Sequence, residues 1–260
     1  MELEPTERFS RRACYYARYR PQYPPEIIDF LAYATNLTPT SVIADMGSGT
    51  GILSKLFLDY GNVVFGIEPN DAMRAAAERL LARYPNFKSI QAMAEATTLN
   101  AQSVDLFVAG LAFHWFEEVQ ARREFKRILR PHGYICLVWN YPRINATPFL
   151  RAYEQLLAKY GTDYSQVKRR DVDEESLRSF FMGDDFGRMT FSNAQFFDFE
   201  GLRGRLLSSS FVPLENDPQF SEMIADLQTI FLAHEENDRV IFDYETKLYY
   251  GQLKSKDAGA

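Results

Sequence analysis

The stretch that decides the fold reads Val42-Ile43-Ala44-Asp45-Met46-Gly47-Ser48-Gly49-Thr50-Gly51. Its first half is an apolar run ending in an acid, which is typical of a buried parallel strand. Glycines then follow at every second position, and glycine lets the backbone turn sharply and approach a ligand without a Cβ in the way. The residues after Gly51 have a helical pattern, and a helix N-terminus offers free N–H groups to a ligand. The stretch therefore predicts a strand, a ligand-binding glycine loop and a helix.

An acid at the end of the next apolar run extends this prediction to a nucleotide site. Glu68 lies 21 residues after Gly47, close to the roughly 20-residue spacing of an acid that binds a ribose hydroxyl. Ile52 occupies the position where a dinucleotide site has its third glycine, which weakens a nicotinamide site. The residues that follow, up to Lys55, lack the order of a P-loop.

The first 140 residues alternate between strand and helix patterns, which predicts a parallel sheet with helices on both faces. Pro25 is placed to begin a helix, Asn70 is a predicted N-cap, and Gly61 and the run 130–133 are predicted helix stops. The expected strands are 41–46, 63–68, 87–90, 104–109 and 134–139, and the expected helices are 26–35, 51–60, 70–83 and 117–129.

After Asn140 the alternation changes, with helices expected at 147–160, 174–182, 201–209 and 218–236 and strands at 195–199 and 239–250. The predicted fold class is α/β: a Rossmann-like, doubly wound, mostly parallel seven-stranded sheet with helices on both faces and a helical cap. We expect one domain. Its expected parts are an N-terminal arm or lid (1–25), a cofactor-binding core (26–140), a helical cap (141–190) and a segment completing the sheet (191–260).

The composition restricts the classes of function. A net charge of −6 and a pI of about 5.3 argue against a nucleic-acid partner, which favours a basic face. The two distant cysteines predict no disulfide framework, and the three dispersed histidines predict no metal site. The charged N-terminus and the lack of a long apolar run predict a cytoplasmic protein without a membrane partner. The oligomeric state is left open.

Four motifs occur in order between about residues 40 and 140: Asp45 to Gly51, Gly66 to Met73, Ala92 to Leu99 followed by Ser103 to Val108, and Ala112 to Phe116. Together they resemble the class I S-adenosylmethionine-dependent methyltransferases. The likeness is strongest to the small-molecule branch that holds trans-aconitate methyltransferases and quinone-biosynthesis C-methyltransferases. The resemblance implies S-adenosyl-L-methionine as cofactor and methyl transfer to a small molecule.

The resemblance also implies roles for residues around the cofactor. The backbone of Gly47 to Gly51 should contact the ribose and methionine part, and Glu68 should accept hydrogen bonds from both ribose hydroxyls. Met73 should face the adenine or serve as core filling, while Arg20 should bind the cofactor carboxylate or lie on the surface. The full expected set is Arg20, Asp45, Gly47, Ser48, Gly49, Glu68, Pro69, Met73, Ala94, Glu95, Gly110 and Leu111.

Methyl transfer from a sulfonium is an in-line displacement, so the protein mainly aligns the nucleophile and excludes water. A base is needed only when the nucleophile arrives protonated. His114, after the fourth strand, is the candidate base, with a structural hydrogen-bonded role as the alternative. The expected substrate-side residues come from the arm and from the ends of the fourth and fifth strands: Tyr15, Tyr19, Trp115, Trp139, Asn140, Tyr141 and Arg143.

Two other functions stay open at this point. One is a non-catalytic S-adenosylmethionine-binding sensor or partner subunit. The other is an NAD-dependent oxidoreductase on a similar sheet, against which Ile52 argues.

Overall fold

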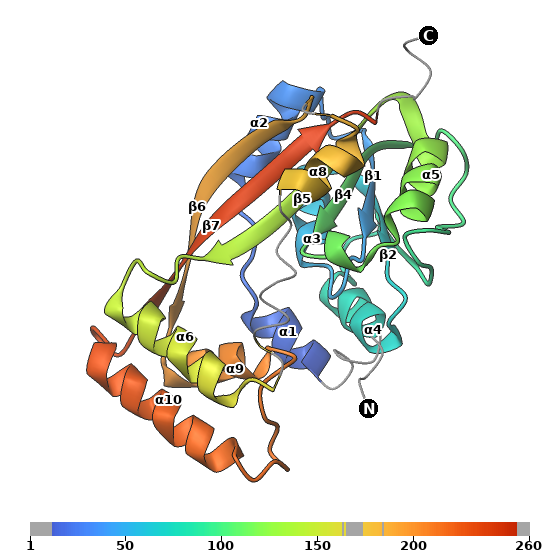
Figure 1. Cartoon of the computed structure of the whole chain (residues 1–260). Coiled ribbons are helices and arrows are strands. Elements are labelled where there is room, and N and C mark those ends of the chain that lie inside the picture. The colour runs from blue at the N-terminus through green and yellow to red at the C-terminus, as the bar shows by residue number, and fades with distance from the viewer. Residues whose placement is uncertain (1–11, 163, 165–173, 184, 254–260) are drawn as a thin grey trace.

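The computed structural model describes residues 12–162, 164, 174–183 and 185–253. It holds a seven-stranded sheet in the order β3-β2-β1-β4-β5-β7-β6 (Figure 1). Strands β1 to β5 pair in parallel, and β7 runs antiparallel to both of its neighbours. The predicted fold class is confirmed. The strands are β1 Val42–Met46, β2 Val63–Ile67, β3 Phe87–Ile90, β4 Val104–Gly110, β5 Leu129–Pro142, β6 Gly187–Phe197 and β7 Val240–Gly251.

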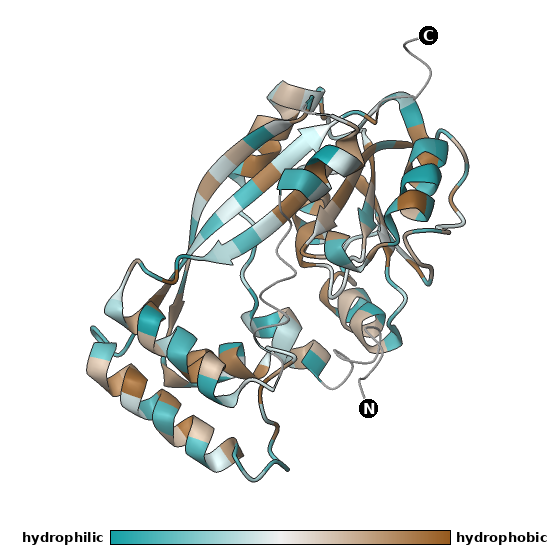
Figure 2. Cartoon of the chain, viewed as in Figure 1, coloured by the Kyte–Doolittle hydropathy of each residue, from teal (hydrophilic) through white to brown (hydrophobic). Residues whose placement is uncertain are grey.

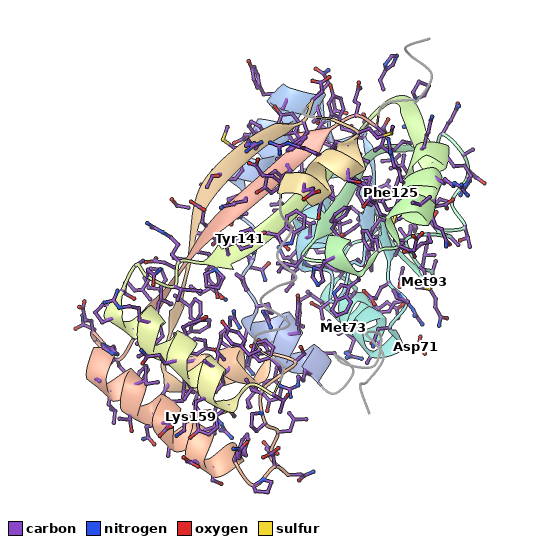
Figure 3. The ribbon with its side chains drawn as sticks, in the orientation of Figure 1. Asp71, Met73, Met93, Phe125, Tyr141 and Lys159 are labelled. Atoms are coloured by element: carbon purple, nitrogen blue, oxygen red, sulfur yellow. The ribbon has the colours of Figure 1, made fainter. Side chains whose placement is uncertain are left out.

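Helices cover both faces of the sheet. On one face, α2 (Glu26–Thr35) and α3 (Ile52–Tyr60) bury side chains such as Leu31 and Phe57. On the other face, α5 (Glu118–Ile128) and α8 (Glu174–Phe181) bury Phe125 and Phe180 against the strands. Figure 3 labels Phe125 between α5 and the sheet. These two cores pack against the strands and hold them in position. The strand ends from which the loops at the carboxyl edge extend are therefore fixed.

The predicted N-cap Asn70 and the predicted helix stop Gly61 are both found at helix ends. The Asn70 side chain accepts a hydrogen bond from the Met73 amide (2.9 Å) and begins α4 (Asp71–Leu80). Gly61 ends α3 with a φ of 109°, a left-handed conformation that favours glycine. Gly61 thus ends α3 just before β2, and Asn70 begins α4 just after β2.

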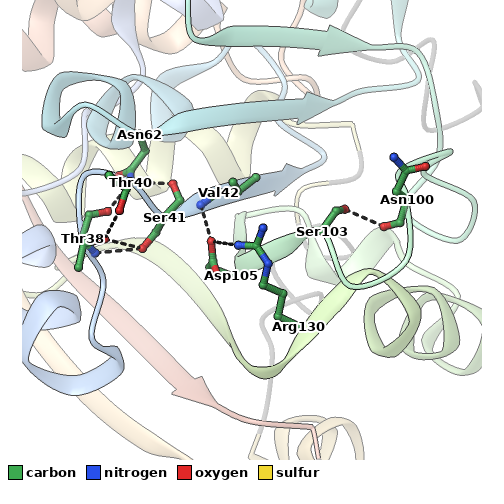
Figure 4. Close-up of polar contacts among 9 residues, drawn as sticks. All are labelled: Thr38, Thr40, Ser41, Val42, Asn62, Asn100, Ser103, Asp105 and Arg130. Atoms are coloured by element: carbon green, nitrogen blue, oxygen red, sulfur yellow. Dashed lines mark hydrogen bonds and ion pairs between the residues drawn. The ribbon is translucent and has the colours of Figure 1, made fainter.

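Strand β5 begins five residues earlier than expected, at Leu129 instead of 134. Val104 pairs with Leu129 but Leu106 pairs with Tyr134, so the proline and glycine of the predicted helix stop form a bulge inside the strand. Figure 4 shows how Asp105 stabilises this place: it accepts from the Val42 amide (2.7 Å) and pairs with Arg130. The helix stop was therefore placed correctly, but the strand start was wrong.

Strand β6 is also longer than expected, because it spans Gly187–Phe197 where the sequence predicted 195–199. Its residues pair with β7 along the whole length, from Gly187 opposite Tyr250 to Phe197 opposite Val240. The predicted last residue, Phe199, instead begins α9 (Phe199–Leu207), and Asp198 is its N-cap. Pairing with a strand more than 40 residues away fixed these bounds, and no local pattern carries that information.

The cap is built from four helices that share one hydrophobic cluster with the start of β7 (Figure 1). They are α1 (Ala13–Tyr19), α6 (Pro148–Tyr160), α9 and α10 (Phe220–His234). The expected cap region 141–190 thus supplies α6 but not α9 or α10, and its other described helix, α8, packs on the sheet. Residues 163, 165–173 and 184 of that region, and residues 1–11 of the arm, lie outside the described part of the chain.

Helix α10 buries Met223, Leu227 and Phe231, which recur every four residues on one face. Figure 2 shows the corresponding alternation of hydrophobic and hydrophilic residues along its ribbon. No helix within the described ranges has the length and hydropathy of a membrane span. Within the same ranges, no group of three acidic, histidine or cysteine side chains is arranged to hold a metal ion.

Candidate active site

Two adjoining cavities lie at the carboxyl ends of β1, β2 and β4, where ligands of doubly wound sheets bind. The larger has a volume of about 260 Å³. Every one of the expected cofactor residues lines at least one of them. The larger cavity is lined by Tyr16, Gly47, Gly49, Glu68, Pro69, Asn70, Met73, Met93, Ala94, Glu95, Gly110, Leu111, Ala112, Trp115 and Phe116. The smaller adds Arg20, Pro21, Tyr23, Asp45, Ser48, Thr50, Ile52 and Leu53.

The backbone of Gly47 and Gly49 lines both cavities, and its conformation and packing leave little room for a side chain. Gly47 and Gly49 have φ values of 64° and 56°, the left-handed region that favours glycine. A Cβ on Gly47 would lie 2.6 Å from the Cβ of Ala112, on the loop after β4. The loop after β1 therefore packs directly on the loop after β4.

Glu68 is a buried carboxylate held by two backbone amides. Its Oε2 accepts from the Gly49 amide and its Oε1 from the Asn70 amide, both at 2.8 Å. Burial raises its pKa, and the two amide hydrogen bonds oppose that shift. Each oxygen has a second lone pair for a ligand hydroxyl. Glu68 thus both fixes the glycine loop and offers two acceptors to one sugar.

Asp45, at the end of β1, presents one oxygen without a protein partner. Its Oδ2 accepts from the Ser54 hydroxyl (2.6 Å), but its Oδ1 is buried and has no hydrogen bond. Burial raises the pKa of Asp45 to about 7. An unsatisfied buried acceptor on the wall of the smaller cavity suits a ligand that carries an N–H donor or a positive charge.

This burial predicts a pH-dependent stability. A carboxyl whose pKa is higher in the folded than in the unfolded chain stabilises the fold at low pH, and that contribution is lost as pH rises from about 4 to 7. Asp45→Asn should therefore raise the free energy of unfolding at pH 8 by up to about 4 kcal/mol, because one pKa unit is about 1.4 kcal/mol. Urea denaturation of both proteins at pH 5 and pH 8 measures the effect. Equal gains at both pH values would contradict this origin.

Two methionines and a tyrosine surround the larger cavity. Met73 on α4 is buried, also packs with Ala13 and Ala76, and lies with its terminal methyl 3.8 Å from a Cβ built on Gly49. Met73 therefore lines the cavity and also packs in a core cluster, while its contact with an adenine stays a prediction. Met93, on the loop after β3, is 55% exposed (Figure 3). Tyr16 of the arm lines both cavities.

Arg20 lines the smaller cavity, which excludes the alternative that it is a surface side chain. It donates to the Ser208 carbonyl (3.1 Å) from Nη2 and lies 5.0 Å from the ring centre of Tyr16. Burial and the neighbouring Arg205 lower its pKa to about 10. The positively charged Arg20 guanidinium could therefore pair with a carboxylate bound in the smaller cavity.

The expected substrate-side residues do not form one surface. Trp115 lines the larger cavity. Trp139 is 2% exposed, packs in the sheet core and lines neither cavity, so its burial argues against the predicted substrate-side role. Tyr141 and Arg143 line a separate surface hollow with Glu245 and Lys247, which shares no residue with the two cavities.

Asn140 and the arm tyrosines also differ from expectation. The buried Asn140 amide accepts from Thr246 and from Asn193, so it serves the sheet rather than an acceptor. Tyr15 and Tyr19 pack against the cap cluster and stack at 6.3 Å. The side chain next to them, Tyr16, is the one that reaches the cavities.

His114 lies on the short helix η2 (Phe113–Trp115). It is half-buried, and its ring centre is 4.8 Å from that of Trp115. Its neighbours Ala112 and Trp115 line the larger cavity, but His114 itself lines neither cavity. Its role as a base stays a prediction.

Several cavity residues were not anticipated. Tyr23 lies so close to Gly110 that a Cβ there would be 2.4 Å from its hydroxyl, and burial raises the pKa of that hydroxyl. Asn70 was predicted only as an N-cap, and Met93 only as part of the motif Ala92 to Leu99. The proline-rich arm was the only signal for Tyr23, because nothing local shows which strand end the arm crosses.

Residues 44–137, which include the glycine loop and Glu68, match the family model described as a methyltransferase domain. This stretch of the chain is therefore similar to a methyltransferase domain. An uncharacterized methyltransferase of Schizosaccharomyces pombe is 32% identical over 145 residues, 55% of this chain and 56% of the relative. One of Mycobacterium bovis is 36% identical over 125 residues, 48% of this chain and 49% of the relative. The chain thus spans about half the length of these curated relatives.

Two solved structures are similar to this chain in fold over most of its length. A candidate type II methyltransferase from Anaeromyxobacter dehalogenans has a TM-score of 0.64 at 20% identity, over 90% of this chain and 98% of that chain. The YcgJ protein of Bacillus subtilis has a TM-score of 0.53 at 17% identity, over 87% and 97%. At these identities the likeness concerns the fold alone.

Proposed function

We propose that this chain transfers a methyl group from S-adenosyl-L-methionine to a small-molecule acceptor by in-line displacement. The observation that carries the proposal is Glu68, which is buried, holds the glycine loop through the Gly49 amide and keeps two acceptor positions toward the larger cavity. The net charge of −6 favours a small acceptor over a nucleic acid.

The side chains around the cavities fit the parts of this cofactor. Glu68 would bind the ribose hydroxyls, and Met73 and Met93 would enclose the base. The unpartnered Asp45 Oδ1 and the Arg20 guanidinium suit the ammonium and carboxylate of the methionine part. When bound, the cofactor supplies a methyl group on a positively charged sulfur. The chain's own contribution is to align the acceptor and exclude water.

Calorimetric titration with S-adenosylmethionine and, separately, with NAD tests the proposal. Saturable binding of the first alone is expected. Binding of NAD alone would favour an oxidoreductase. Binding of S-adenosylmethionine without turnover of any acid, phenol or amine acceptor would favour the sensor or partner subunit.

His114 is proposed as the base for acceptors that arrive protonated, because it lies in the chain between Ala112 and Trp115, which both line the larger cavity. His114→Ala should slow turnover by about 100-fold, a common contribution of a general base. The S-adenosylmethionine Kd should change little, since His114 does not line the cavity. A variant with full activity would remove His114 from the mechanism.

A further inference from the structure

An arginine lies buried inside the cap with only neutral partners. Arg205 on α9 is 5% exposed. Its Nε donates to the Tyr244 hydroxyl (3.1 Å), its Nη1 lies 3.5 Å from the Ser209 hydroxyl, and its guanidinium lies over the Phe242 ring. No ion pair within the described ranges includes Arg205. A buried guanidinium without an acid is costly, so its position calls for a physical reason.

A second arginine increases that cost. Arg20 donates to the Ser208 carbonyl, next to the Ser209 hydroxyl that Arg205 contacts. The two positive charges lie close enough for Arg205 to lower the pKa of Arg20, although burial is the larger cause. Like charges brought together in a buried place favour an anion between or beside them.

Two polar atoms in this cluster also have no partner. They are the Nε of Arg20 and the hydroxyl of Tyr153, a side chain that is 2% exposed. Glu154, the next residue on α6, accepts a hydrogen bond from Tyr164 and is engaged there. Buried donors without acceptors are rare in folded proteins, and each one needs an explanation.

This cluster adjoins the candidate active site. Arg20 and Tyr16 belong to the arm and line the smaller cavity together with Asp45 and Gly110. The arm helix α1 packs against both α9 and α4, and Figure 1 shows it between these two helices. The Tyr19 ring lies where a Cβ on Gly204 would be, which brings α1 and α9 into close contact.

We propose that Arg205 and Tyr153 bind a carboxylate of the methyl acceptor, so that the acceptor is an anionic small molecule. A planar carboxylate fits the guanidinium fork and accepts from the tyrosine hydroxyl. This inference rests on the proposed function. Arg20, on the cavity wall, serves the methionine carboxylate, and Arg205, deeper in the cap, serves the acceptor.

The test uses glutarate as a carboxylate probe and glutaramide as its neutral counterpart, each titrated into the full chain saturated with S-adenosylhomocysteine. Glutarate alone should bind. Arg205→Met should weaken its binding by about tenfold or more, since charge-assisted hydrogen bonds are lost. The matched control is Arg151→Met, an exposed arginine on α6, which removes the same charge and should leave the affinity unchanged.

A second measurement separates binding from structure. Because replacing a buried, unpaired charge with an apolar side chain is often neutral or stabilising, Arg205→Met should keep the thermal midpoint of the wild type or raise it. A strongly lowered midpoint would make Arg205 a structural residue and overturn the proposal. So would equal binding of glutarate and glutaramide, or binding of neither.

Affinity for S-adenosylhomocysteine shows whether Arg205 binds the carboxylate of the acceptor or that of the cofactor. It should be unchanged in Arg205→Met, and a loss equal to that of glutarate would assign Arg205 to the cofactor. Failure of the proposed function has a different signature. The chain would then bind neither S-adenosylmethionine nor S-adenosylhomocysteine, while glutarate titrated alone would still distinguish wild type from Arg205→Met.

Discussion

Replacing Glu68 with alanine should raise the Kd for S-adenosylmethionine about 100-fold. The wild-type carboxylate accepts from the Gly49 and Asn70 amides and keeps one lone pair on each oxygen for a ribose hydroxyl. Two charge-assisted hydrogen bonds to a ligand account for a loss of this size, at about 1.5 kcal/mol each. The variant also removes the hydrogen bond between the Gly49 amide and Glu68. Part of the binding free energy must then be spent on ordering the glycine loop. Calorimetric titration measures the change.

Two further variants define the cause. Glu68→Gln keeps the size of the side chain but can accept at only one end, so its NH₂ would face an amide donor, and its affinity should be intermediate or lower. Glu26→Ala removes an exposed carboxylate at the start of α2 and should leave the affinity unchanged. The circular dichroism spectra of all three variants should match the wild type. Unchanged affinity in Glu68→Ala would remove this carboxylate from the cofactor site.

The residues of the proposed cofactor site were predictable because the information that places them is local. The strand, the alternating glycines and the following helix lie within one continuous stretch, and parallel strands bring their carboxyl ends to one edge. Asp45 and Glu68 therefore had to be neighbours once β1 and β2 paired in parallel. The left-handed conformations of Gly47 and Gly49 explain why glycine is favoured at both positions.

The residues of the proposed acceptor site were not predictable in the same way. Arg205 and Tyr153 lie on different helices, and only the packing of the cap brings them toward Arg20. The extent of β6 likewise follows from its pairing with β7 and not from its own pattern. Long-range contacts place these residues, and a sequence alone shows neither the contact nor the absence of a partner for a buried charge.

Trp139 illustrates how proximity to a strand end can mislead. Side chains alternate between the two faces of a strand, so a residue near the carboxyl end can point into a core rather than toward a ligand. Trp139 does so: its ring meets Phe113 and Tyr249 edge-on, at 6.3 and 5.9 Å between ring centres. It is among the largest fully enclosed side chains of the fold. Its contribution should therefore be to stability.

Trp139→Ala should lower the free energy of unfolding by about 3–5 kcal/mol, because it removes a buried aromatic ring and leaves a cavity. Urea denaturation measures this loss, and Trp139→Phe, which keeps an aromatic ring, should lose less. Affinity for S-adenosylmethionine in the folded Trp139→Phe protein should equal that of the wild type, since Trp139 lines neither cavity. A Trp139→Phe variant with normal stability and a raised KM for the acceptor would reverse this assignment. In that case the ring would contact the acceptor after all, through a movement of Phe113 and the η2 segment that carries His114.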